Sequence, residues 1–112
     1  MAAGKHNFTI EQGSTFNREI TVQENSQALN LTGYSARMQM RSTHDSSTIA
    51  LTITASVANP ATQGKINLTA AATATSAVEE GIYVYDLEIE SSAGNVTRIL
   101  EGQVTVTPEV TR

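Results

Sequence analysis

The side chains best suited to metal binding or catalysis are few in this chain, and their spacing does not bring them together. The two histidines, His6 and His44, lie far apart in the sequence, and only His44 has a close acidic neighbour, Asp45. There is no cysteine. A metal site needs several converging ligands. The sequence therefore predicts no metal site and no bound cofactor.

Carboxylates are the other reactive groups, and they occur in two clusters. Glu79 and Glu80 are adjacent, and a further acidic set alternates along one segment: Asp86, Glu88 and Glu90. Alternation places this second set on one face of a strand. A hydrolase would need two carboxylates held across a cleft, whereas charges on an open strand discourage edge pairing. The arginines expected to pair with them across strands are Arg37, Arg41 and Arg98. We therefore expect no enzymatic activity and no small-molecule substrate.

A tyrosine near the start of a predicted strand indicates the architecture. Gly81 and Tyr83 follow the acidic pair and open the strand 82–90. In a tyrosine corner the phenol bonds main chain a few residues upstream, at the point where a Greek-key sandwich crosses between sheets. Tyr85 occupies the position of the cysteine found in antibody domains. The similarity is architectural and does not indicate a function.

Two-residue alternation of apolar and polar side chains dominates the rest of the chain, and helical periodicity is nearly absent. The fold class predicted is all-β, an immunoglobulin-like Greek-key sandwich of about seven antiparallel strands. In the second strand, Arg18 is the odd member of an otherwise apolar face. The residues expected to fill the interior are Phe16, Met38, Ile53, Leu68, Leu87 and Val104.

Two local features complete the predicted fold. The alanine-rich segment 69–78 predicts one short helical turn between the sheets, because alanine favours helix and threonine limits its length. The last strand, 96–107, contains Gly102, which we interpret as a bulge. Its residues expected to face inward are Val96, Leu100, Val104 and Val106.

Length and composition predict the domain organisation and exclude some classes of function. The 112 residues predict one domain, divided into a flexible N-terminal arm (1–7), the sandwich (8–107) and a C-terminal tail (108–112). A net charge of −4 excludes nucleic acid as the main partner. No apolar run is long enough to span a bilayer, so no membrane role is expected. The N-terminus lacks the apolar region of a signal peptide, and folding in a cytoplasm is expected.

Four segments taken together resemble a known family. They are 8–16, 31–41, 81–88 and 98–106. In order and spacing they resemble small β-sandwich virion proteins of tailed bacteriophages, notably cyanobacterial phages. They are also similar to the N-terminal domain of phage baseplate upper proteins, which anchors fibres or receptor-binding proteins to the tail.

The resemblance implies a non-enzymatic structural protein of a virion assembled in the host cytoplasm. Its partners would be other virion proteins, with copies of the chain forming a homo-oligomer in a symmetric particle. A tail, baseplate or fibre-attachment role is expected, with a capsid decoration protein as an alternative. A carbohydrate- or receptor-binding module is a further alternative, for which Tyr34 is the candidate exposed aromatic. The candidate partner surface comprises Lys5, His6 and Tyr34.

Overall fold

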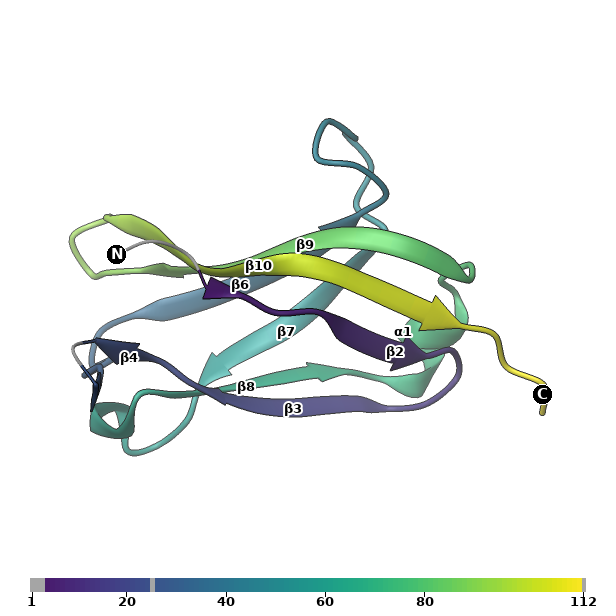
Figure 1. Ribbon diagram of the computed structural model, residues 1–112. Helices are drawn as coiled ribbons and strands as arrows, with labels where there is room; N and C mark the ends of the chain where they lie inside the picture. The colour runs from purple at the N-terminus through teal and green to yellow at the C-terminus, as the bar shows by residue number, and fades with distance from the viewer. Residues whose placement is uncertain (1–3, 25, 112) are drawn as a thin grey trace.

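The computed structural model describes residues 4–24 and 26–111, which form an all-β sandwich (Figure 1). The strands are β1 (Gly4–Lys5), β2 (Phe8–Glu11), β3 (Phe16–Thr21), β4 (Gln23–Glu24), β5 (Gln27–Ala28), β6 (Ser35–Arg41), β7 (Leu51–Val57), β8 (Lys65–Ala70), β9 (Gly81–Glu90) and β10 (Val96–Thr107). Two helical turns interrupt them, η1 (Ala61–Gln63) and α1 (Ala72–Ser76). The predicted fold class is confirmed, and α1 lies inside the alanine-rich segment.

The two layers of the sandwich come from one hydrogen-bonded sheet that bends over itself at β7. Its order is β1-β10-β9-β6-β7-β8-β3, with β2 also on β10. The first half of β7 pairs with β6 and its second half pairs with β8. One layer therefore contains β6, β9 and β10, and the other contains β8 and β3 (Figure 1). This is the strand distribution of an immunoglobulin-like sandwich, with the first strand moved onto β10.

The edge formed by β1 and β2 differs from the prediction of antiparallel strands throughout. Both strands pair with β10 in parallel, with Phe8 opposite Val104 and Ile10 opposite Val106. Alternation of side chains along a strand indicates which of them face the core. It does not specify the neighbouring strand or its direction, so this pairing was not predictable from the pattern.

The N-terminal arm also differs from the expectation. Gly4 and Lys5 already pair with β10, and the His6 amide donates to the carbonyl of Glu101 at 3.0 Å. Gly102 permits this close approach, because a Cβ there would collide with the main-chain oxygen of His6. The sandwich edge therefore begins at Gly4, and residues 1–3 lie outside the described part of the chain.

The bulge predicted at Gly102 lies elsewhere in β10. The register against β9 shifts between Arg98 and Leu100, so the irregular residue is Ile99, which is buried. On the N-terminal side of Ile99, the shift exchanges the inward-facing and outward-facing positions of the strand. Val96 consequently points outward and is 47% exposed, contrary to the prediction.

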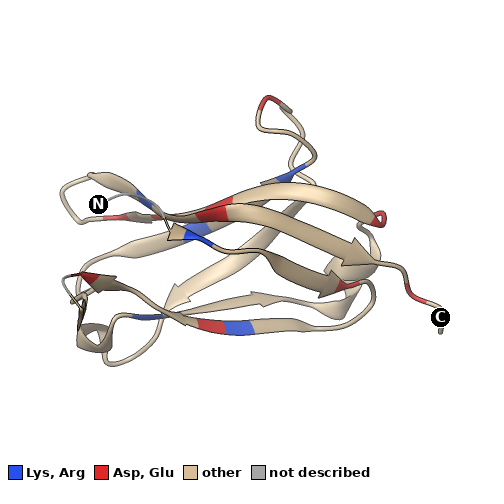
Figure 2. Cartoon of the chain, in the orientation of Figure 1, with Lys and Arg blue, Asp and Glu red and all other residues tan. Residues whose placement is uncertain are grey.

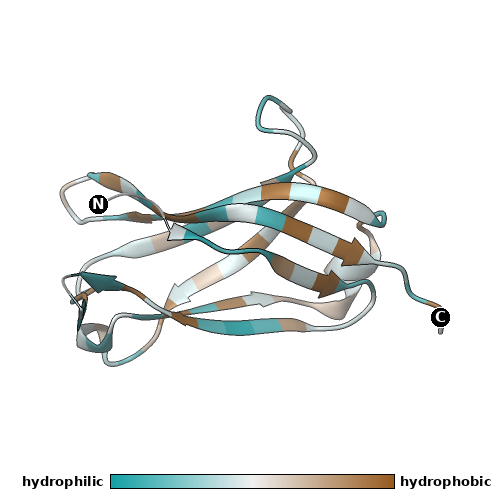
Figure 3. Ribbon diagram, viewed as in Figure 1, coloured by the Kyte–Doolittle hydropathy of each residue, from teal (hydrophilic) through white to brown (hydrophobic). Residues whose placement is uncertain are grey.

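The core itself follows the predicted alternation. Figure 3 shows hydrophobic and hydrophilic bands alternating along β9, β10 and β2. The six residues expected in the interior are all buried: Phe16, Met38, Ile53, Leu68, Leu87 and Val104. Burying one such side chain stabilises a fold by about 1.5–3 kcal/mol. The packed interior therefore fixes the strands whose edges form the candidate site.

Candidate functional site

The tyrosine corner residues occupy the turn that leads from α1 into β9. The Tyr83 hydroxyl donates to the carbonyl of Glu79 at 2.7 Å, and Gly81 between them has a φ of 149°. The ring is half-buried rather than buried. Its partial burial, and secondarily the charge of Glu79, raises the pKa of Tyr83. The arrangement braces the crossing between layers and presents no reactive group.

The candidate partner residues lie in different parts of the chain's fold. Lys5 and His6 lie exposed along β10, whereas Tyr34 precedes β6 and is half-buried against the core. The Tyr34 amide donates to the carbonyl of Leu31 at 3.0 Å, which fixes this turn. Tyr34 is therefore not the fully exposed aromatic platform that sugar binding would use.

Lys5 and His6 instead border a cleft that the sequence analysis did not anticipate. We call this cleft, of about 610 Å³, the seam, because it lies where the two layers meet at β1 and β3. Apolar side chains from both layers line it: Phe8, Ile20, Val22, Ile99 and Leu100. Figure 1 shows β2 beside β10 in one layer and β3 beside β8 in the other. The volume falls within the range of known small-molecule pockets.

The charged groups at the seam are mainly cationic. Lys5 and Arg18 line it together with one carboxylate, Glu19. Lys65 neutralises Glu19 in an ion pair at 3.8 Å. The guanidinium of Arg18 lies 5.1 Å from the centre of the Phe16 ring and donates to the carbonyl of Asn17. Arg18 is thus the sequence signal that marks this site, since it interrupts an otherwise apolar alternation and lies exposed at the rim of the cleft.

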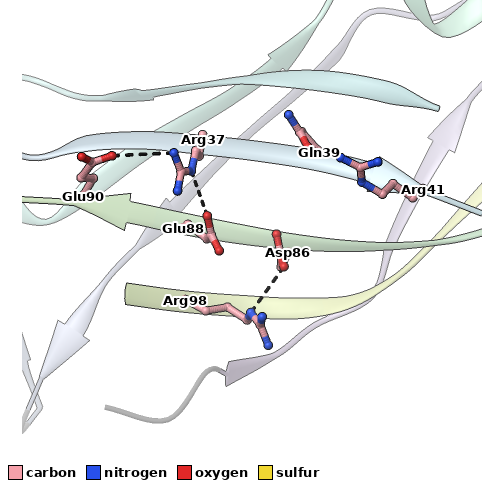
Figure 4. Close-up of polar contacts among 7 residues, drawn as sticks. All are labelled: Arg37, Gln39, Arg41, Asp86, Glu88, Glu90 and Arg98. Carbon is pink, nitrogen blue, oxygen red and sulfur yellow. Dashed lines mark hydrogen bonds and ion pairs between the residues drawn. The ribbon is translucent and has the colours of Figure 1, made fainter. Parts of the chain in front are cut away.

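A second cluster covers the outer face of β6, β9 and β10 (Figure 4). Arg37 bonds Glu88 at 2.8 Å and approaches Glu90 at 3.7 Å, while Arg98 lies 3.4 Å from Asp86. Figure 2 shows acidic and basic segments close to one another on these strands. The predicted pairing of Arg37 and Arg98 with the acidic set is confirmed.

Arg41 behaves differently from the other two arginines. Its guanidinium donates to the carbonyl of Ser46 at 2.9 Å and to the side chain of Gln39 at 3.1 Å. It therefore anchors the loop after β6 instead of pairing with a carboxylate, contrary to the prediction.

On this outer face the charges of the arginines and the carboxylates largely cancel one another. The hydrogen bond and charge of Glu88 raise the pKa of Arg37. Partial burial raises the pKa of Asp86, helped by Glu88 and opposed by Arg98. The three carboxylates of β9 lie in a row along one strand and do not face one another across a cleft. Surface pairs of this kind contribute little to stability.

His44 and Asp45 lie exposed in the loop after β6. Among residues 4–24 and 26–111, no group of three His, Cys, Asp or Glu side chains is placed to hold a metal ion. In the same residues, no helix has the length and apolar character needed to cross a bilayer.

The comparisons with known proteins bear on the fold alone. No family model and no curated protein matches the sequence. Solved structures do match, among them the crystal structure of CopC from Methylosinus trichosporium OB3b. The TM-score is 0.52 at 11% identity, and the alignment covers 94% of this chain and 89% of that chain. The phage family expected from the sequence resemblance stays a prediction.

Proposed function

We propose that the chain is a non-enzymatic assembly or adaptor module of a bacteriophage virion, placed at the tail, baseplate or fibre attachment. The single structural observation that carries the docking part is the seam. It combines an apolar cleft of about 610 Å³ with the outer edge of β3 at the end of the sheet. Unpaired strand edges are ready surfaces for association. The virion setting comes from the resemblance of the four sequence segments.

The charged outer face supports an assembly role over catalysis. Glu88 and Asp86 are paired with Arg37 and Arg98, and the hollow beside Asp86 is small, about 120 Å³. Catalytic groups are instead found in clefts, with protonation shifted to suit the reaction. In a particle of many copies, avidity lets each contact be modest.

The test is to locate the chain in intact particles. Phage particles are purified from the host that carries this gene, separated into heads and tails, and probed with an antibody against the chain. We expect the chain in the tail fraction. Recovery with heads alone would indicate a capsid decoration protein, and absence from washed particles would overturn the virion proposal. A major head protein and a major tail protein serve as fraction markers.

A further inference from the structure

We infer that the seam binds an extended acidic–apolar segment of a partner protein, which adds to the edge of β3 as a further strand. The inference rests on the proposed function, because it names the surface and the kind of partner that an assembly role requires.

The main chain of β3 provides the first argument. In the described residues β3 pairs with β8 alone, through the register Phe16–Ala70 to Thr21–Lys65, and it ends the sheet order. Its other side therefore presents N–H and C=O groups with no strand partner in residues 4–24 and 26–111. An added strand satisfies such groups, and the main-chain hydrogen bonds supply affinity without regard to sequence.

The floor of the seam provides the second argument. Phe8 and Val22 are buried beneath it, and Ile20 and Leu100 are half-buried at its sides. Alternate side chains of a strand paired with β3 point toward this floor. Apolar residues at every second position would bury against it, which favours an alternating segment over a uniformly polar one.

Arg18 provides the third argument and sets the specificity. Arg18 shares the strand parity of Phe16 and Ile20, and its side chain is exposed at the rim of the seam. A charge at such a position on an edge strand ordinarily discourages pairing. A carboxylate on the incoming strand reverses this effect, since it gives Arg18 a charge-assisted partner. Lys5 on the opposite side of the seam reinforces the preference. The same arginine therefore admits an acidic strand and rejects a neutral or basic one.

Two of the chain's own acidic–apolar segments make contacts within the fold, although Val110 in the second is 90% exposed. The best match is β9, which is central in the sheet and pairs with both β6 and β10. Glu109, beyond the last strand, donates its amide to the side chain of Gln12 at 3.0 Å. With these segments engaged, the proposal places a different protein in the seam, and a second copy is an outcome that the test below distinguishes.

A tethered strand tests the inference without knowledge of the natural partner. The sequence Val-Thr-Glu-Thr-Val, whose Glu shares one strand face with both Val residues, is fused ahead of the full chain through a Gly/Ser linker, which gives it a high effective concentration at the seam. A matched fusion carries Lys in place of the Glu. We expect the Glu fusion to raise the melting temperature by a few degrees and to shift the amide resonances of β3. The Lys fusion is expected to do neither.

Two variants identify the responsible charge. Arg18→Glu is expected to reverse the ranking of the two fusions, whereas Arg37→Glu, a matched reversal on the outer face, is expected to leave it unchanged. Equal melting temperatures, or a ranking indifferent to Arg18→Glu, would overturn the inference. Concentration-dependent shifts of β3 in the unfused protein would assign the seam to a second copy, which also overturns it. A chain found in phage particles together with inert fusions would leave the proposed function standing and remove only this binding mode.

Discussion

The hydroxyl of Tyr85 donates a hydrogen bond to the main-chain oxygen of His6 at 2.6 Å, although the two residues are 79 positions apart. Tyr85 is buried in β9, and its ring centre lies 5.2 Å from that of Phe8. Burial, and secondarily the charge of Glu101, raises the pKa of Tyr85 and keeps its hydroxyl protonated as a donor. The bond holds the start of the sandwich against the sheet and so builds one wall of the seam.

Removing this hydroxyl tests its role. Tyr85→Phe keeps the ring but leaves the His6 carbonyl without its partner, so we expect a loss of about 1–3 kcal/mol of unfolding free energy. The His6 amide, which donates to Glu101, should also exchange with deuterium faster than in the parent protein. Exchange at His6 equal to that of the parent would show that the bond does not hold β1 in place.

Tyr83→Phe is expected to cost less, about 0.5–1.5 kcal/mol. Its bond to Glu79 lies at a half-exposed site, where water replaces the lost donor. Chemical denaturation of the two variants side by side measures the difference. Exchange at the His6 amide should stay unchanged in Tyr83→Phe, which makes it the matched control for Tyr85→Phe. An unchanged denaturation midpoint would show that the corner contributes nothing.

The contrast between these tyrosines shows which contacts can be predicted from the sequence and which cannot. The Tyr83 contact is local, so a glycine and an acidic pair a few residues upstream are enough to suggest it. The Tyr85 contact depends on β2 and β10 pairing in parallel. No alternation pattern specifies that pairing, because a strand's own sequence records its buried face and not its neighbour.

Gly102 and Arg18 mark where sequence signals were present but ambiguous. A glycine inside a strand indicates either a bulge or a close backbone approach. We predicted the first, and the structure shows the second, with the main chain of His6 against Gly102. Arg18 stood out from its apolar face, but only the meeting of β1 and β3 shows that it borders a cleft.

Gly102→Ala tests the close approach directly. The added Cβ would collide with the His6 carbonyl and lie 2.9 Å from the side-chain oxygen of Asn7. We expect about 1–3 kcal/mol of destabilisation, with amide shifts confined to β1, β2 and the adjacent part of β10. Since Tyr85→Phe loosens the same segment, the double variant should lose less than the sum of the two single losses. Full additivity would contradict a shared contact.

Metal removal is expected to leave the molecule unchanged. The expectation rests on the separation of His6 from His44 and on the exposed position of Asp45. Thermal unfolding with and without a chelator, after dialysis against the common divalent cations, checks it. A melting temperature that falls with the chelator and recovers with one metal would reveal a site, and His44→Ala would then show whether that loop provides it.

We expect the titration of Asp86 to contribute to the pH dependence of stability. Partial burial raises the pKa of this carboxyl in the folded state, so the native protein favours the protonated form. That preference stabilises the fold at pH values below the unfolded pKa and is lost as the pH rises through the folded pKa. Asp86→Asn is permanently neutral and removes the cost of the buried charge at pH 7, although it also gives up the 3.4 Å contact with Arg98.

We therefore expect Asp86→Asn to be slightly more stable than the parent at pH 7, since burial is the largest cause of the shift. The difference should shrink as the pH falls toward 3 and Asp86 itself becomes neutral. Urea midpoints across this range measure it, with Glu90→Asn on the same strand face as the control. A variant that is less stable than the parent at pH 7, with the deficit disappearing in acid, would show instead that the attraction of Arg98 outweighs the burial of the charge.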